Sequence, residues 1–298
     1  MISVDKLTEI FCEVDDFCQL FEAEYAKKAL PSDKKTRNRK TQLSQSEMVT
    51  IMIAFHLSGF RTFKHFYTGY VAVHWREHFP KQVSYNRFVE LQPRCAAAMV
   101  MFLNHRCKGR CSGISFIDST SIKVCRNQRI NSNKTFKNIA ERGRTSMGWF
   151  FGFKLHLIAN DRGDIVSFLL TKGNVSDNNT QMVSTLAEDL FGKLFGDKGY
   201  ISKKLFGVLF NKGVHLVTKI RNNMKNVLMT MADKILLRKR AIIESINDEL
   251  KNICQIEHSR HRSLHNFFMN IASALCAYNY LEKKPSLKVE YHNSRQLS

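Results

Sequence analysis

The sequence lacks a long apolar run, and it contains few prolines and few acidic residues. Its longest apolar stretch, residues 96–103, is far shorter than the roughly 20 residues that a membrane-spanning helix requires. The first residues are acidic where a signal peptide has basic residues followed by an apolar core. We therefore expect a soluble, cytoplasmic protein with no membrane partner.

Four prolines and 14 glycines in 298 residues leave little room for long linkers or low-complexity segments. The 44% hydrophobic residues suffice for a sizeable core, and the length predicts one large or two modest domains. The eight cysteines form no obvious disulfide framework, which is typical of reduced core thiols. Cys107 and Cys111 lie near His105, but no second ligand pair follows at zinc spacing, so we expect no zinc site.

Basic residues outnumber acidic ones by 46 to 26, which gives a formal net charge of +20. An excess of this size favours an anionic polymer as partner, with nucleic acid ahead of a membrane surface. A protein that is merely basic remains an alternative on charge alone.

Residues 1–108 have the pattern of short helices separated by tight turns. Ser44 and Glu47 form a capping box ahead of an apolar run, which predicts a helix start. Exposed cations, including Arg61, Lys64 and Arg87, are compatible with a helix-turn-helix that binds DNA. An ordinary helical bundle explains the same pattern equally well.

From residue 112 onward the pattern changes to strands and helices. One strand is predicted at 112–124, a polar stretch follows at 126–146, and two strands flank a hairpin turn at 161–163. Helices then alternate with two further strands. This order predicts an α/β fold: an RNase H-like mixed sheet flanked by helices, preceded by the all-helical N-terminal region. The sheet domain is expected at 112–283, followed by a polar tail at 284–298.

Three carboxylates stand out within this domain. Asp118 interrupts an apolar strand, where a buried charge requires a partner or a metal, although capping of the next turn is an alternative. Asp197 ends a short strand before a glycine turn, where simple turn chemistry is the alternative. Glu244 lies within a predicted helix at 231–254, where a surface salt bridge to Arg240 is the alternative.

Together, two Asp residues on strands and one Glu on a helix can converge at one edge of such a sheet. Phosphodiester chemistry uses this arrangement, because two metal ions about 3.5–4 Å apart activate the attacking oxygen and stabilise the leaving one. Hard oxygen ligands suit Mg²⁺ or Mn²⁺. Lys154 and His156 alternate with apolar residues on a strand and are predicted to face phosphate or the carboxylates, with a solvated strand face as the alternative.

The motifs that contain these residues resemble those of DDE transposases of bacterial insertion sequences, within the RNase H-like nuclease group. FIDST resembles the first-Asp motif, FGDKGY the second, and the stretch ending at Asp177 the family's GN-x-x-D segment. Arg240, Glu244 and Lys251 stand at the spacing of the closing Tyr-Arg-Glu-Lys signature, whereas Leu237 replaces the Tyr.

The resemblance implies that Asp118, Asp197 and Glu244 bind two Mg²⁺ ions and catalyse strand cleavage and strand transfer. It also implies contacts with DNA by Arg240 and Lys251, and we expect Lys198 beside the second Asp to contribute. The implied partners are double-stranded DNA, as terminal inverted repeats and as target, and further copies of the chain in a multimer, so the protein would be associated with the bacterial nucleoid.

Two other functions remain open from the sequence: an RNase H-like nuclease without strand transfer, and a non-catalytic DNA-binding protein derived from a transposase. The 47 positions from Asp197 to Glu244 hold a helix, a strand and a connection, and they leave no room for a large insertion domain.

Overall fold

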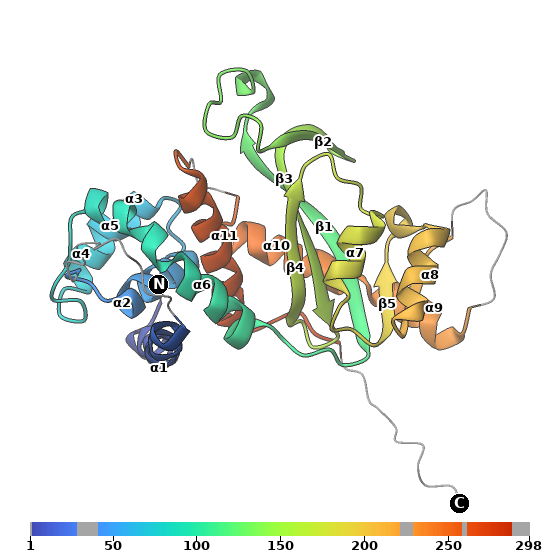
Figure 1. The fold of residues 1–298 in the computed structure, drawn as a ribbon, viewed down its shortest axis with the longest axis horizontal. Helices are drawn as coiled ribbons and strands as arrows, with labels where there is room; N and C mark the ends of the chain where they lie inside the picture. The colour runs from blue at the N-terminus through green and yellow to red at the C-terminus, as the bar shows by residue number, and fades with distance from the viewer. Residues whose placement is uncertain (1, 29–40, 221–228, 258–260, 288–298) are drawn as a thin grey trace, which may run out of the picture. The chain divides into compact units, whose positions relative to one another are not determined.

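The computed structural model divides the chain into two compact units, which we call the helical unit and the sheet unit (Figure 1). It describes residues 2–28, 41–220, 229–257 and 261–287. The helical unit comprises residues 1–107 and 249–281, and the sheet unit comprises 108–248 and 282–298. Most of the polar tail predicted at 284–298 lies outside the described residues.

Helix α2 (Gln45–Leu57) forms the centre of the helical unit. The predicted capping box is present: Ser44 accepts a hydrogen bond from the Glu47 backbone N–H, and the Glu47 carboxylate accepts one from the Ser44 N–H. The helix is apolar on all sides and buried from Met48 to His56, as expected for a helix surrounded by others. It contacts α1 (Val4–Lys28) and α11 (Leu264–Asn279).

The other helical segments described in this unit are short, and aromatic rings hold them together. Phe88 packs against Tyr67 and Phe63, with ring centroids 4.8 Å and 5.3 Å apart. The segments are α3 (Phe63–His65), a π-helical turn (Phe66–Val71), α4 (Ala72–His74), α5 (Tyr85–Leu91), a 3₁₀ turn (Gln92–Cys95), α6 (Ala96–Phe102) and a second π-helical turn (Leu103–Cys107). In the described part of residues 1–107, the regular elements are therefore all helical, as predicted.

Helix α11 belongs to the helical unit, although the sequence analysis grouped its residues with the sheet. The reason is packing: α11 contacts α2 and α6, and its residues Met269 to Tyr278 are buried. No helix within the described ranges is both long and apolar enough to cross a membrane.

The sheet unit is built on a six-stranded mixed sheet in the order β2-β3-β1-β5-β6, with β4 also paired to β3. β1 is antiparallel to β3 and parallel to β5, and β5 is parallel to β6. The strands are β1 (Ile114–Cys125), β2 (Glu141–Thr145), β3 (Gly148–Asn160), β4 (Ile165–Lys172), β5 (Gly192–Gly196) and β6 (Val214–Thr218). The expected mixed α/β architecture is confirmed, whereas β2 was predicted as part of a polar connection.

Helices cover both faces of this sheet. α7 (Thr180–Leu186) and α8 (Lys203–Asn211) pack on one face through a buried cluster that includes Ile117, Ile158 and Leu194. On the opposite face lies α10 (Ala241–Asn252), because its Asn247 contacts Asp118, the next residue along β1 after Ile117.

The long helix predicted at 231–254 is two helices, α9 (Met231–Lys239) and α10, which meet at Arg240. The Arg240 carbonyl accepts a hydrogen bond from the Ile243 N–H, three residues ahead, so the chain makes a tight turn there. This turn and the register of β1 and β5 determine the geometry of the candidate site.

Candidate active site

Asp118 and Asp197 occupy equivalent positions on neighbouring parallel strands. Phe116 of β1 pairs with Phe195 of β5, and each aspartate follows its phenylalanine by two residues. The backbone of Asp197 is extended, with φ −76° and ψ 172°, so it continues the strand direction. Residues two apart on a strand share a face. The register therefore places both aspartates at the same end and on the same face of the sheet.

Glu244 approaches this face from α10. Asn247, three residues further along the helix, donates a hydrogen bond to Oδ2 of Asp118 at 3.1 Å. The guanidinium of Arg240 pairs with the Glu244 carboxylate and lies 3.9 Å from Oδ1 of Asp118. Arg240 therefore contacts two of the three carboxylates that the sequence predicts for the site, Asp118 and Glu244.

The surroundings of Asp118 are poor in water and rich in negative charge. Burial raises the pKa of Asp118 to about 6, while the Arg240 guanidinium and a hydrogen bond from the Ser119 backbone oppose the rise. The negative charges of Glu244 and Asp177 raise it further. This carboxyl is thus a group that a nearby cation would stabilise in its ionised form.

The three predicted ligands lie in one region of the sheet unit, but their side chains are not arranged around a common metal position. Over the described ranges, no three His, Cys, Asp or Glu side chains are close enough to hold a metal ion. Asp197 is exposed, and the Glu244 side chain is 56% exposed and turned to Arg240. Carboxylate oxygens are nevertheless the donors that hard divalent cations prefer, so the donor chemistry fits Mg²⁺ or Mn²⁺.

Asp177 is a fourth carboxylate beside Asp118 whose part in the site the sequence analysis did not recognise. It accepts hydrogen bonds from the hydroxyl of Ser119 at 2.8 Å and from Nζ of Lys154 at 3.0 Å. It therefore links β1, at the residue after Asp118, to β3. The GN-x-x-D motif was a signal for this residue, but nothing in the motif indicates its partners.

Lys154 and His156 face away from Asp118. Lys154 pairs with Ser121 across the sheet and His156 with Ser119, whereas Asp118 pairs with Leu157. His156 is fully buried, and its Nε2 lies 2.9 Å from the Thr171 hydroxyl. Burial lowers the pKa of His156 to about 4, so the ring is neutral at pH 7. Lys154 is the ion-pair partner of Asp177.

The structure also places the remaining predicted DNA contacts. Lys198 is exposed in the turn after Asp197. Lys251 lies in the helical unit and pairs with Glu257 at 3.4 Å. Arg87 is exposed and pairs with Glu90 at 3.0 Å.

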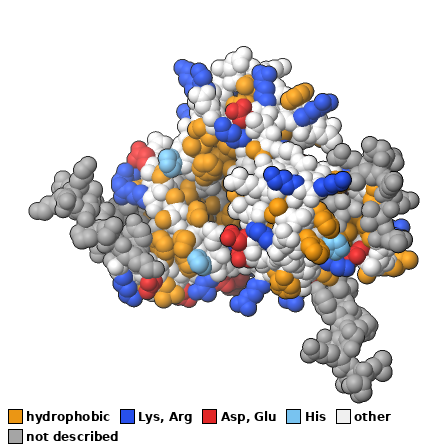
Figure 2. All heavy atoms as spheres, turned by 45° about the vertical axis from the view of Figure 1, so that its right-hand side comes forward, with side chains coloured by type: hydrophobic (Ala, Val, Ile, Leu, Met, Phe, Trp, Pro, Cys, Tyr) orange, Lys and Arg blue, Asp and Glu red, His pale blue; other side chains and the backbone are white. Residues whose placement is uncertain are grey.

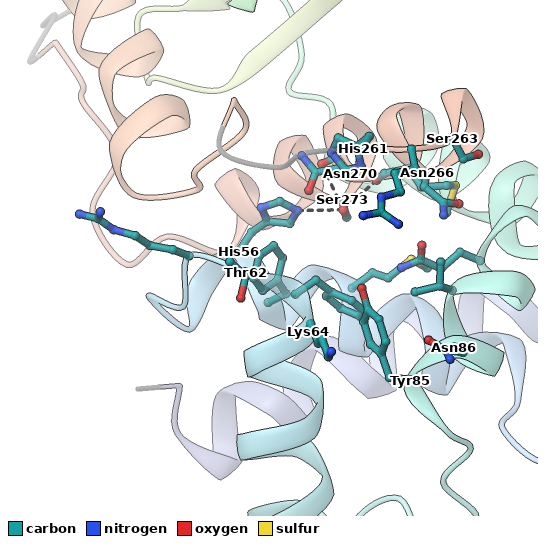
Figure 3. A pocket seen from close by; sticks show the side chains of 18 residues that line it. His56, Thr62, Lys64, Tyr85, Asn86, His261, Ser263, Asn266, Asn270 and Ser273 are labelled. Carbon is teal, nitrogen blue, oxygen red and sulfur yellow. Dashed lines mark hydrogen bonds between the residues drawn. The ribbon is translucent and has the colours of Figure 1, made fainter. Parts of the chain in front are cut away.

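Arg61 and Lys64 line a pocket of about 890 Å³ in the helical unit (Figure 3). Figure 3 shows His261, Asn266, Asn270 and Ser273 of this pocket on the side opposite Tyr85. Three cations line it, Arg61, Lys64 and Arg262, and none of its lining residues is acidic. The pocket therefore has the charge of an anion-binding surface.

Lysine and arginine side chains are also widespread on the face of the molecule drawn in Figure 2. They are interspersed with apolar side chains and with fewer acidic ones. The net charge of +20 is consistent with this surface.

Comparison with known proteins identifies the family to which this chain belongs. The family model described as a transposase DDE domain matches residues 108–264. No curated protein matches the chain. The solved structure of a piggyBac transposase synaptic complex with hairpin DNA aligns with a TM-score of 0.46 and 10% identity, covering 91% of this chain and 72% of that one. Because the family match spans more than half of its residues, this chain belongs to the transposase DDE domain family.

Proposed function

We propose that this chain cleaves one DNA strand at the ends of an insertion sequence and joins the freed 3′-OH to target DNA. The observation that carries the proposal is the register of β1 and β5, which aligns Asp118 with Asp197 on the face approached by α10. Membership of the DDE domain family supports the same assignment. Glu244 is the proposed third carboxylate.

The proposed cofactor is a pair of Mg²⁺ or Mn²⁺ ions held by Asp118, Asp197 and Glu244. When bound, such ions supply an activated water or 3′-OH and stabilise the leaving oxygen. The protein's own residues prepare this step. Asn247 holds one oxygen of Asp118, and that carboxylate is partly shielded from solvent, with its side chain 23% exposed.

Arg240 has a second role in the proposal. It is shared by two carboxylates, and its side chain is 13% exposed, so the guanidinium lies close to where a scissile phosphate would meet the ligands. A planar guanidinium binds phosphate oxygens in pairs. We expect Arg240 to exchange its carboxylate contacts for phosphate when DNA is bound, with Lys198 and Lys251 contributing further contacts.

We propose that the helical unit binds the terminal inverted repeats. The pocket lined by Arg61 and Lys64 supports this role because its charged lining residues are all cationic. We further propose that copies of the chain join two ends on bacterial chromosomal DNA in the cytoplasm.

The test is a cleavage and strand-transfer assay on a labelled duplex that carries one end of the element. The reaction is run with Mg²⁺, Mn²⁺ or EDTA, and it compares the wild type with Asp118→Asn and Glu244→Gln. Glu188→Gln is the matched control, because Glu188 is an exposed glutamate of the same unit outside the site. We expect metal-dependent nicks and joined products from the wild type and the control, and at least a hundredfold loss in both site variants.

Each other outcome selects a different function. Nicks without joined products would identify a nuclease that lacks strand transfer. DNA binding without metal-dependent cleavage would identify a non-catalytic DNA-binding protein. Full activity of Glu244→Gln would remove Glu244 from the proposed ligands.

A further inference from the structure

The segment that leads from β1 into β3 is strongly basic and contains no part of the carboxylate site. Of residues 126–149, six are Lys or Arg and one is acidic. The acid, Glu141, pairs with Lys172 outside the segment. The six cations are exposed, and none forms an ion pair with another described residue. They are Arg126, Arg129, Lys134, Lys137, Arg142 and Arg144.

The β2–β3 hairpin in this segment carries exposed apolar side chains at its tip. Met147 is 92% exposed and Trp149 is 62% exposed. The guanidinium of Arg144, the cross-strand partner of Trp149, lies over the indole at 5.8 Å. Burial of large apolar side chains stabilises a fold, so leaving two of them exposed side by side forgoes that stabilisation.

The position of these side chains follows from the fold. Gly143 and Phe150 are buried on one face of the hairpin, which leaves Arg144 and Trp149 on the other. The amide of Asn127 donates a hydrogen bond to the Trp149 carbonyl at 2.9 Å and so joins the start of the segment to the hairpin. Figure 1 shows the segment extending beyond the sheet, and Figure 2 shows basic and apolar side chains together at that end.

We propose that this hairpin, residues 141–149 with the flanking cations, is a DNA-docking element in which Met147 and Trp149 enter a groove and the cations contact phosphates. Proteins that bend DNA combine apolar wedges with cations in this way. The six cations form no ion pair with another described residue, so their positive charge is available to an anionic partner. This favours DNA over an apolar protein surface. The inference rests on the proposed function for its substrate.

The strand geometry also predicts where on the DNA the hairpin docks. Trp149 lies eight residues before Leu157, the cross-strand partner of Asp118. At about 3.3 Å per residue, Trp149 is at most about 26 Å from the partner of the aspartate, and Met147 at the tip is at most about 33 Å from it. The rise of B-DNA is about 3.4 Å per base pair, so the tip reaches no more than about ten base pairs from the scissile phosphate.

The experiment measures duplex binding in EDTA, where cleavage is not required, by fluorescence anisotropy over a range of salt concentrations. The variants are Trp149→Ala and the pair Arg142→Gln with Arg144→Gln. The matched controls are Phe210→Ala, an exposed aromatic residue on α8, and the pair Lys203→Gln with Lys204→Gln on the same helix. Thermal unfolding of each variant checks that the fold is retained.

We expect about a tenfold weaker affinity for Trp149→Ala, the loss typical of one stacked aromatic residue. The double arginine variant should lose about two units from the slope of log affinity against log salt, because each phosphate contact contributes about 0.9. A photo-crosslinker that replaces Met147 should react with bases away from the cleavage point but within about ten base pairs of it.

Equal losses in the α8 controls, or crosslinks confined to the cleavage point, would overturn the proposal. Retained DNA affinity together with lost binding to anionic vesicles or to another protein would assign the hairpin to that partner instead. Because binding is measured without metal, a chain that binds through the hairpin but never cleaves DNA would disprove the proposed function and leave this inference standing.

Discussion

Asp118 shows how one residue combines the demands of the fold with those of the site. Its carboxyl is largely buried, and its side chain is 23% exposed. A carboxyl whose pKa is raised in the folded state binds its proton more tightly there than in the unfolded chain. The fold therefore loses stability as the pH rises from the ordinary pKa to the folded pKa, and this loss is complete at higher pH.

The first prediction concerns Asp118→Asn in EDTA. The folded pKa of about 6, against an ordinary 3.8, corresponds to at most about 3 kcal/mol. The variant should gain stability over the wild type as the pH rises from 4 to 6 and keep that gain at higher pH. In a separate assay with Mg²⁺ it should lose cleavage. Urea denaturation at pH 4, 5, 6 and 7.5 measures the difference. A stability difference that does not change with pH would contradict the assignment of a raised pKa.

The second prediction concerns Asp177→Asn. The ion pair with Lys154 is sheltered, since the Lys154 side chain is 12% exposed, and its loss leaves a partly buried ammonium without its counterion. We expect a loss of about 1–3 kcal/mol. Cleavage should fall with DNA affinity unchanged, because Asp177 holds the residue next to Asp118.

Glu24→Gln on α1 is the control for that change. Its ion pair with Lys27 is exposed on both sides, at 58% and 71%, so its loss should cost less than about 1 kcal/mol. Denaturation and the cleavage assay are run on both variants in parallel. Equal losses of stability would show that shelter from water does not distinguish the two ion pairs.

At the scale of elements, α10 determines whether Glu244 reaches the sheet. Ile243, Ile246 and Leu250 are fully buried along one side of the helix, and Asn247 lies beside them. These positions recur every three or four residues, so packing fixes the rotation of the helix. Glu244 is thus held on its face largely by three apolar side chains that have no chemical role.

The third prediction follows from this packing. Ile246→Ala should cost about 2–5 kcal/mol, because it leaves a cavity at a fully buried position. Cleavage should fall further than DNA affinity does, since the helix that carries Glu244 loses its support. Ile235→Ala on α9, where the side chain is 49% exposed, is the control and should change stability by less than about 1 kcal/mol. A fully stable Ile246→Ala variant would show that α10 is held by other contacts.

Local sequence signals predicted the elements that depend on neighbouring residues. The capping box at Ser44 and the turn at 161–163 are two examples, and Gly163 adopts a positive φ of 83° in that turn. Periodicity predicted the strands other than β2 and their order along the chain. Strand β2 escaped prediction because its residues, ERGRT, are polar, and pairing with β3 makes it a strand.

Features that depend on contacts between distant residues could not be predicted from the sequence pattern. The turn at Arg240 divides a continuous helical pattern, and Arg240 contacts Asp118, more than a hundred positions away. Asn247 carries no motif, and its role follows only from its hydrogen bond to Asp118. The sequence thus indicated which carboxylates to consider, while their protein partners required the fold.

At the scale of the whole molecule, charge determines how the chain meets DNA. With a net charge of +20, we expect binding to any duplex to fall steeply with salt. If six phosphates are contacted, affinity should fall about a thousandfold between 50 and 200 mM salt, as measured by anisotropy on a duplex of unrelated sequence. A nearly flat salt dependence would contradict an electrostatic binding surface.

The helical unit is discontinuous in the chain, since α11 completes a core that begins with α1 and α2. During synthesis the early helices leave the ribosome before α11 is made. The side of α2 that packs against α11 therefore stays uncovered until α11 follows. A nascent or truncated chain that stops before residue 264 cannot close this core. An interrupted translation product would therefore expose apolar residues of α2 and should be cleaved by proteases more readily than the full-length chain.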